Sequence, residues 1–198
     1  MKLPRSFYES EDVVALAIKL LGKELVTCFD GVTTSGIITE TEAYAGVTDK
    51  ASHAYGGRRT GRTEIMYARG GTAYVYLCYG MHSLFNVVTN VKDVPHAILI
   101  RAIQPAKGVD VMLARTGKSK VTSAFAEGPG KVAKALGIHY SHSGLDLTNG
   151  DIWIEDRKIG IPPEEIIAGP RIGVGYSGED ALLPYRFIWK TKSVNIDK

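Results

Sequence analysis

Two glutamates, Glu40 and Glu42, stand two residues apart in a β-branched segment, residues 37–42 (IITETE), that is typical of a strand. Alternate side chains of a strand point to the same face, so we expect both carboxylates and Tyr44 on one side of a sheet. Two acids on one face repel each other unless each has a partner or one stays protonated. The pair is therefore either a solvated or ion-paired structural feature or the site of a catalytic carboxylate.

A partner for these acids is Arg101, which interrupts an apolar, strand-like stretch. A buried arginine needs an acidic partner, and Glu40 or Glu42 is the natural candidate. His53 follows the glutamates in a long loop, and with them it could ligate a metal ion in a metallohydrolase. The chain has no HExxH motif or closely spaced histidine set to support that alternative. A lone loop histidine is more often a surface residue.

A β-hairpin is predicted over residues 71–89, with its turn at residues 79–81. Tyr74 and Tyr76 share one face of its first strand, and Tyr79 falls at the tip. Strand tyrosines are commonly packed with their hydroxyl groups satisfied. Alternatively, one ring lines a pocket and the ring at the tip is a wedge that pushes between nucleic-acid bases. The sequence pattern leaves both interpretations open.

Basic residues gather in two glycine-containing segments. The first is the long loop over residues 44–67, which contains Arg58, Arg59 and Arg62. Such a run is more often solvated than a phosphate site, although loops of this length in compact domains tend to be functional or disordered. The second is a Gly/Pro turn at residues 127–130 that leads into a helix with Lys131 near its N-terminus. Free N–H groups and a lysine there favour a phosphate, and a tight turn with an exposed lysine is the alternative.

The remaining elements must position these residues. A helix is predicted over residues 10–22, with Ser10 as its N-cap. Residues 23–30 predict a strand that pairs with the strand containing Glu42. A short helix is expected over residues 108–115, with Val109, Met112 and Leu113 facing inward. Further β-structure is predicted at residues 151–155, 171–175 and 186–189.

Length and composition indicate one domain. The chain has 198 residues, of which 44% are hydrophobic, enough for a single core. Cys28 and Cys78 lie in separate strand-like segments and predict reduced thiols in a cytosolic protein. No apolar run predicts a signal peptide or a membrane span, so no membrane partner is expected. The net charge of +3 and the pI of about 8.8 permit a nucleic-acid partner without requiring one.

Five stretches of the chain resemble the bacterial form of the alkyladenine (3-methyladenine) DNA glycosylase family. They follow the family's order over almost the whole chain: TETEAYAG with SHAYGGRRT, GGTAYVYLCYGMHSLFNVVT, AILIRAIQP, EGPGKVAKALGI, and GPRIGVGYSGE with LPYRF. One departure is clear. Thr60-Gly61-Arg62-Thr63 stands where the family usually has Thr-Pro-Arg-Asn, and this bears on how the loop is anchored and contacts DNA.

The resemblance implies roles for the residues of a base pocket. Glu42 matches the glutamate that activates a water molecule, and Arg101 matches the arginine that helps to hold it. Glu40 receives no catalytic role and is expected to be structural. The rings that stack a flipped base fall on Tyr44, His53 and Tyr76. Asn86 matches a residue that guards the pocket against bases with extra exocyclic groups.

The resemblance also implies contacts with the DNA duplex. The wedge that fills the gap left by the flipped nucleotide falls on Tyr79, with Met81 and His82 beside it. Lys131 matches a phosphate contact, and Thr60 matches a DNA-binding position in the atypical loop.

The family implies a single α+β domain over residues 1–198. It would have a curved antiparallel sheet, a protruding β-hairpin, surrounding helices and no helix-hairpin-helix motif. The implied activity is that of a monofunctional DNA glycosylase that starts base excision repair on double-stranded DNA containing alkylated or deaminated purines. No metal and no cofactor are expected, and the protein would be a monomer in the bacterial cytoplasm, at the nucleoid. A metallohydrolase and a non-catalytic binder of distorted DNA remain the alternatives.

Overall fold

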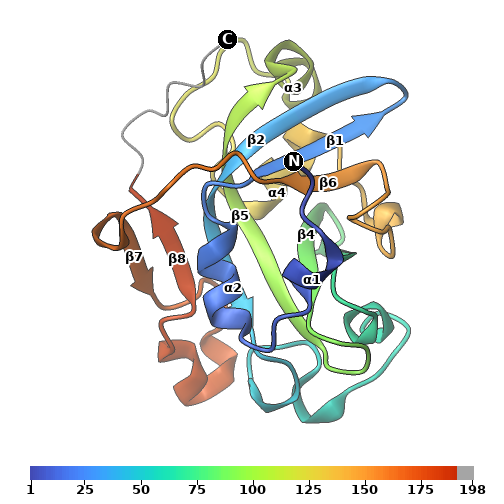
Figure 1. The fold of residues 1–198 in the computed structure, drawn as a ribbon, viewed down its shortest axis with the longest axis vertical. Coiled ribbons are helices and arrows are strands. Elements are labelled where there is room, and N and C mark those ends of the chain that lie inside the picture. The colour runs from blue at the N-terminus through green and yellow to red at the C-terminus, as the bar shows by residue number, and fades with distance from the viewer. Residues whose placement is uncertain (191–198) are drawn as a thin grey trace.

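A computed structural model of the chain describes residues 1–190 and forms a single domain built on one antiparallel sheet (Figure 1). The eight strands of the sheet follow the order β3-β4-β5-β2-β1-β6, with β8 paired to β2 and β7 paired to β8. Their bounds are Glu24–Phe29 (β1), Val32–Tyr44 (β2), Thr72–Cys78 (β3), His82–Thr89 (β4), His96–Lys107 (β5), Ile152–Glu155 (β6), Ile166–Gly169 (β7) and Arg186–Trp189 (β8). The predicted pairing of residues 23–30 with the strand of Glu42 is confirmed.

The long strand β2 explains why the sheet curls. Its first half pairs with β1, and residues 40–42 pair with β8 on the same side. Between these halves the register with β5 shifts twice, so that Thr39 on β2 and Arg101 on β5 have no direct partner. Bulges of this kind bend a strand and increase its twist. The predicted curved sheet of an α+β fold is confirmed.

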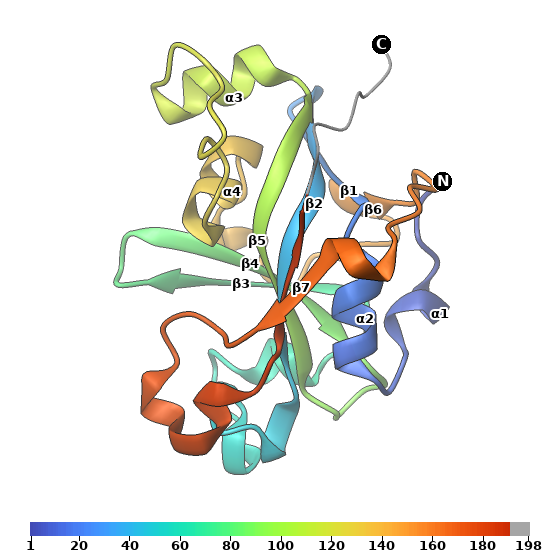
Figure 2. The same cartoon turned by 90° about the vertical axis from the view of Figure 1, so that its left-hand side faces the viewer.

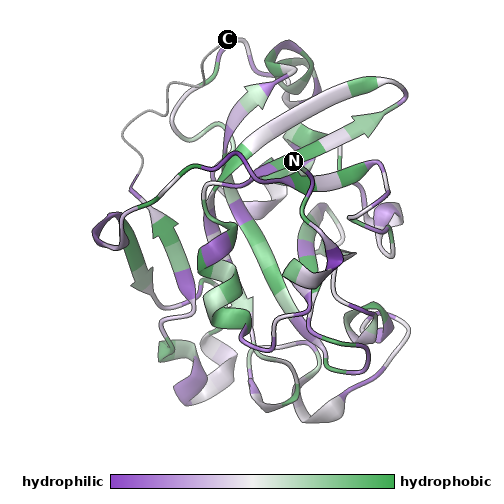
Figure 3. Ribbon diagram, viewed as in Figure 1, coloured by the Kyte–Doolittle hydropathy of each residue, from purple (hydrophilic) through white to green (hydrophobic). Residues whose placement is uncertain are grey.

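Helices cover both sides of this sheet. They are α1 (Arg5–Tyr8), α2 (Val13–Leu20), α3 (Val109–Thr116) and α4 (Pro129–Leu136). Short 3-10 turns lie at Gly46–Thr48, Tyr55–Gly57, Glu64–Tyr67, Tyr140–His142, Pro163–Glu165 and Gly175–Leu182. Apolar residues concentrate along β5 and α2, where the main core forms (Figure 3). Within residues 1–190 no helix is both long enough and apolar enough to cross a membrane.

Two local predictions are corrected by the structure. Asp12, not Ser10, caps α2, because the helix begins at Val13 and the Asp12 carboxylate accepts the Ala15 N–H at 2.8 Å. Residues 171–175 form no strand, because the chain turns here into the 3-10 segment Gly175–Leu182; the missed strand is β7, just before them. The inward face predicted for α3 agrees with the structure: Met112 is buried in the core, Leu113 packs partly buried against it, and Val109 is half-buried.

The predicted hairpin is confirmed as β3 and β4, and it projects away from the sheet beside α4 (Figure 2). Cys78 pairs with His82, which leaves residues 79–81 as the turn. Tyr79 adopts a left-handed backbone conformation with φ of 51°, uncommon for a residue other than glycine. The Tyr79 side chain is 90% exposed. The tip therefore presents a large ring to solvent rather than to the core.

Candidate active site

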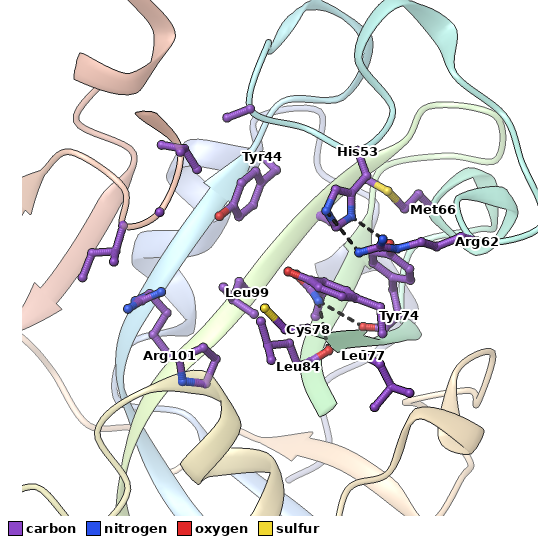
Figure 4. Close-up of a pocket in the computed structure, with 18 of the residues that line it drawn as sticks. Tyr44, His53, Arg62, Met66, Tyr74, Leu77, Cys78, Leu84, Leu99 and Arg101 are labelled. Atoms are coloured by element: carbon purple, nitrogen blue, oxygen red, sulfur yellow. Dashed lines mark hydrogen bonds between the residues drawn. The ribbon is translucent and has the colours of Figure 1, made fainter. Parts of the chain in front are cut away.

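A cavity of about 490 Å³ opens between β2, the hairpin, the loop over residues 45–67 and the segment after β7 (Figure 4). Five predicted site residues line its wall: Tyr44, His53, Tyr76, Asn86 and Arg101. Tyr79 reaches its rim from the hairpin tip. The cavity is also lined by Met66, Ile172 and Tyr176, to which the sequence assigned no role, and by Arg62 and Tyr74, whose roles the sequence left open.

Glu42 is fully buried directly behind this wall, and both of its carboxylate oxygens accept hydrogen bonds. The Tyr44 hydroxyl donates to Oε2 at 2.8 Å, and the Ile172 N–H donates to Oε1 at 2.8 Å. Both donors belong to residues that line the cavity. A carboxylate has about four lone-pair sites, so Glu42 retains acceptor capacity beyond these two bonds.

Arg101 lies beside both glutamates, in agreement with the prediction that this buried arginine pairs with Glu40 or Glu42. Its Nε lies 3.1 Å from Glu40 Oε1 and 3.5 Å from Glu42 Oε1. Arg101 lies two residues after Leu99 on β5 and lines the cavity with it, whereas Ile100 between them belongs to the core. Glu40 has a second cationic partner, Arg186, at 3.2 Å. Glu40 is thus held between two arginines, whereas Glu42 shares only one.

Burial is the main influence on the protonation of Glu42. It raises the pKa of the Glu42 carboxyl above its ordinary value, while Arg101 and the hydrogen bonds from Ile172 and Tyr44 lower it in part. The negative charge of Glu40 raises it further. A carboxyl with a raised pKa, behind a cavity and beside a specific cation, has the character of a catalytic acid or base.

Three aromatic side chains pack together on the opposite wall. The ring centroids of Tyr74 and Tyr76 are 5.4 Å apart, and His53 meets Tyr76 edge to face at 4.8 Å. His53 Nδ1 lies 2.9 Å from the Tyr74 hydroxyl, and its Nε2 lies 3.5 Å from the Arg62 guanidinium. A guanidinium can only donate, so Nε2 is the acceptor and Nδ1 carries the proton. Burial, then Arg62 and Arg58, lower the pKa of His53 to about 4, so the ring is neutral at pH 7.

Tyr44 is braced from behind by a buried ion pair. The Arg171 guanidinium carbon lies 4.8 Å from the centroid of the Tyr44 ring, and Arg171 donates to Asp49 Oδ1 at 2.8 Å. Arg171 also donates to the main-chain carbonyl of Ala43. Because Ile172 follows directly in the chain, this pair also fixes the N–H that binds Glu42. In the sequence, the only signal for this ion pair was the position of Arg171, a charged residue within the predicted strand 171–175.

Asn86 lies on β4 in the cavity wall and is buried. Its amide nitrogen donates to the main-chain carbonyls of Tyr74 and Leu84, at 3.2 and 3.3 Å. The side chain is therefore fixed in place by the hairpin itself.

The remaining predicted residues surround the mouth of the cavity. Met81 is 73% exposed next to Tyr79, and His82 packs against Gly130 at the start of α4. Lys131 is exposed, and its ammonium group donates to the Ala124 carbonyl at 3.1 Å. Thr60 lies in the atypical loop, where its N–H donates to Thr63 Oγ1 at 2.8 Å. Thr63 therefore closes the turn with its hydroxyl where the family usually has asparagine.

The acid, imidazole and thiol side chains do not gather around a common point. Within residues 1–190, no group of three or more His, Cys, Asp or Glu side chains is arranged to hold a metal ion. Glu42 and His53 contact different partners on separate walls of the cavity, as described above.

Comparison with known proteins agrees with this arrangement. The family model described as "Methylpurine-DNA glycosylase (MPG)" matches residues 6–193. A protein of Chlamydia felis is 50% identical over 191 residues, which cover 96% of this chain and 97% of that protein. A protein of Chlamydia abortus is 49% identical over 192 residues, covering 96% and 100%, and one of Bacillus cereus is 46% identical over 202 residues, covering 96% of each. All three bear the name "Putative 3-methyladenine DNA glycosylase". The resemblance seen in the sequence is confirmed, and the chain belongs to the methylpurine-DNA glycosylase family of DNA-repair hydrolases.

Proposed function

We propose that this DNA glycosylase extrudes a damaged purine nucleotide from double-stranded DNA and hydrolyses its N-glycosidic bond with a water molecule activated by Glu42. The observation that carries the proposal is the buried Glu42 carboxylate, bonded to Tyr44 and Ile172 and facing Arg101, behind a cavity large enough for one base. The sugar carbon of a stacked nucleotide cannot be reached within the duplex, so the nucleotide must be flipped out first.

In this mechanism the ionised Glu42 orients water against C1′ of the sugar. A bond forms between the water oxygen and C1′ as the bond from C1′ to the purine nitrogen breaks. The electron pair of that bond leaves with the base, and Glu42 takes the proton of the water. The transition state resembles an oxocarbenium ion, which the Glu42 carboxylate stabilises by its charge. The products are the free base and an abasic site.

The aromatic residues of the cavity select the base in this proposal. Tyr44 stacks on one face of the purine, and His53 and Tyr76 stack on the other. Electron-poor alkylated bases gain from aromatic stacking by the same electrostatics as a cation above a ring. A neutral His53 suits this role, because an imidazolium would repel a positively charged base. Asn86 would exclude bases that carry extra exocyclic groups.

The exposed residues at the cavity mouth hold the DNA. Tyr79 would fill the gap in the base stack, with Met81 and His82 beside it, because its ring stands free at the hairpin tip. Lys131 and Thr60 would contact phosphates. No step requires a metal or a cofactor, and we expect the protein to act as a monomer in the bacterial cytoplasm.

A base-release assay tests this proposal against its alternatives. Duplexes that each carry one defined lesion (hypoxanthine, ethenoadenine, 3-methyladenine or 7-methylguanine) are incubated with the protein, with and without a chelator. The proposal predicts free base and an abasic site at the same rate in both. Loss of activity with the chelator, restored by added metal, would indicate a metallohydrolase. Tight binding of lesion DNA without release of any base would indicate a non-catalytic binder.

A further inference from the structure

Arg62 is an exposed loop residue that places a positive charge beside the aromatic part of the cavity. Its guanidinium carbon lies 4.7 Å from the centroid of the Tyr76 ring, and its Nη2 lies 3.5 Å from His53 Nε2 (Figure 4). Arg62 also lines the cavity together with Tyr74. The side chain thus contacts the same rings that we propose to stack the damaged base.

The charge of Arg62 has no counter-ion nearby. Three other arginines near the site are neutralised: Arg59 by Glu64 and Asp93, Arg101 by Glu40, and Arg171 by Asp49. Among the described residues Arg58 also makes no ion pair, but it does not line the cavity, and its effect on His53 is smaller than that of Arg62. Within the part of the chain that the structure describes, Arg62 makes no ion pair. Its electrostatic field in the cavity is therefore uncompensated, whereas the fields of the other three are largely cancelled.

The loop holds this charge near the cavity. The Thr60 N–H donates to Thr63 Oγ1 at 2.8 Å, and the Thr63 hydroxyl also contacts the Arg58 carbonyl at 3.0 Å. Thr63 is only 3% exposed, so the turn that carries Arg62 is anchored on both sides. The departure from the usual Thr-Pro-Arg-Asn sequence thus still produces a closed turn.

The effect of Arg62 on another positive charge can be followed at His53. After burial, the Arg62 charge is the largest influence that lowers the pKa of His53, which means that it disfavours a cation on that ring. A purine cation stacked against His53 would occupy the same region and meet the same repulsion.

Damaged purines fall into two electrostatic classes. Alkylation of a ring nitrogen, as in 7-methylguanine, leaves the base in DNA with a formal positive charge, whereas hypoxanthine and ethenoadenine are neutral. Neutral purines also present acceptor atoms to a guanidinium, which carries five N–H donors. We propose that Arg62 is a specificity-determining residue that favours neutral lesions over cationic ones, opposing the attraction of the aromatic rings for cations. The inference rests on the proposed function, since it assumes that the base enters this cavity.

The test measures single-turnover rates of base release at saturating protein, on duplexes carrying either 7-methylguanine or hypoxanthine. In Arg62→Ala, the ratio of the cationic to the neutral rate should rise on the order of tenfold, as expected for a unit charge removed several ångströms away. Arg62→Lys retains the charge and should keep a ratio near that of the wild type. Arg59→Ala is the matched control, because it removes a charge from the same loop that lies outside the cavity wall and is already neutralised.

A second readout does not depend on catalysis. The His53 pKa, followed by NMR titration of the ring, should rise in Arg62→Ala and stay nearly unchanged in Arg62→Lys. An unchanged His53 pKa, or equal changes in the two rates, would overturn the inference. If the wild type released neither base, the proposed function would fail instead, and the two failures are thereby distinguished.

Discussion

Two regions differ in burial and in hydrogen bonding: the cavity wall backed by Glu42, here called the floor, and the turn at residues 79–81, here called the tip. At the floor, Glu42 is fully buried, and each of its oxygens accepts a hydrogen bond from a fixed donor. At the tip, Tyr79 and Met81 are 90% and 73% exposed on a turn with a left-handed tyrosine. Large exposed apolar side chains gain burial only in a complex, whereas buried polar groups are oriented before a substrate arrives. The contrast supports our proposal that the chemistry takes place at the floor and that the tip opens the DNA.

The largest expected effect is at the floor. Glu42→Gln should lower the rate of base release by about 10²–10⁴-fold, the usual contribution of a general acid or base. Glutamine has the same shape, and its amide can still accept from Ile172 and donate to the Tyr44 hydroxyl, so binding to abasic-site DNA should persist. The measurement is a single-turnover rate together with a binding isotherm.

Glu40→Gln is the matched control for this change, because it alters the same strand two residues away. It should retain most of the activity, since Glu40 is held between Arg101 and Arg186, whereas Glu42 is the carboxylate bonded to the cavity-lining residues Tyr44 and Ile172. If Glu40→Gln were the more damaging of the two, the assignment of the catalytic carboxylate would be wrong.

The pH dependence of base release sharpens the same distinction. Glu42 must be ionised to activate water, and burial raises its pKa, so activity should rise with pH through a midpoint above the ordinary carboxyl range. Below that midpoint the rate should fall about tenfold per pH unit. The charge of Glu40 contributes to the raised pKa, so Glu40→Gln should move the midpoint to lower pH. A rate profile with a midpoint near 4.5, the ordinary glutamate value, would contradict this.

The stability difference between Glu42→Gln and the wild type should depend on pH in a definite direction. Because the folded-state pKa of Glu42 is raised, the fold favours the protonated carboxyl, and this contribution to the free energy of unfolding is lost as the pH rises through that pKa. Glu42→Gln should therefore raise Tm relative to the wild type above this pH, with little difference in acid. Thermal unfolding of both proteins across the pH range checks the sign, and a Tm loss at neutral pH would contradict it.

At the tip, Tyr79→Ser should slow base release by about tenfold or more when the lesion is well paired. Flipping costs a few kcal/mol, least for mispaired or damaged bases, so the loss should shrink opposite a mismatch. Chemistry on a base that is already flipped needs Glu42 and the cavity rather than Tyr79. A fluorescent base analogue beside the lesion reports unstacking, alongside single-turnover rates on both substrates.

Equal losses on paired and mispaired lesions, with no change in the unstacking signal, would show that Tyr79 is not the wedge. Met81→Ser is the natural next variant, because Met81 is the other large apolar side chain exposed at this turn.

The sequence could predict those features that depend on local patterns. Period-two alternation predicted the hairpin and the strand of Glu42, because strand periodicity is local. The choice of acids as partners for Arg101 also followed from local reasoning, since a buried arginine needs a carboxylate. The bulges at Thr39 and Arg101 depend on pairing between distant strands and leave no local pattern.

Contacts between distant segments were missed for the same reason. Arg171 lies far along the chain from Asp49 and Tyr44, yet it braces both the stacking ring and the N–H that binds Glu42. The position of Arg171 within an apolar stretch is typical of a buried side chain, but it does not identify Asp49 as the partner. The loop arginines were indistinguishable in sequence, and only the structure separates Arg59, with two acidic partners, from Arg62, with none among the described residues.

The smallest expected effect concerns a residue that belongs to neither floor nor tip. Lys131 is exposed two residues after Pro129 of the cavity wall, and it shares a second hollow of about 610 Å³ with Lys118, Lys120 and Lys134. Lys131→Ala should remove one phosphate contact and therefore weaken binding to damaged and undamaged duplexes alike. The slope of log binding constant against log salt concentration should fall in magnitude by about one. The three remaining lysines keep the loss in affinity modest, and the single-turnover rate at saturating protein should not change. Lys158→Asn is the control: it removes another exposed charge, two residues after Asp156, whose N–H donates to the Met1 carbonyl, and asparagine tolerates the positive φ of 56° there. An effect of Lys131→Ala confined to lesion DNA would place this lysine in base recognition, and an equal slope change in Lys158→Asn would show that net charge alone is responsible.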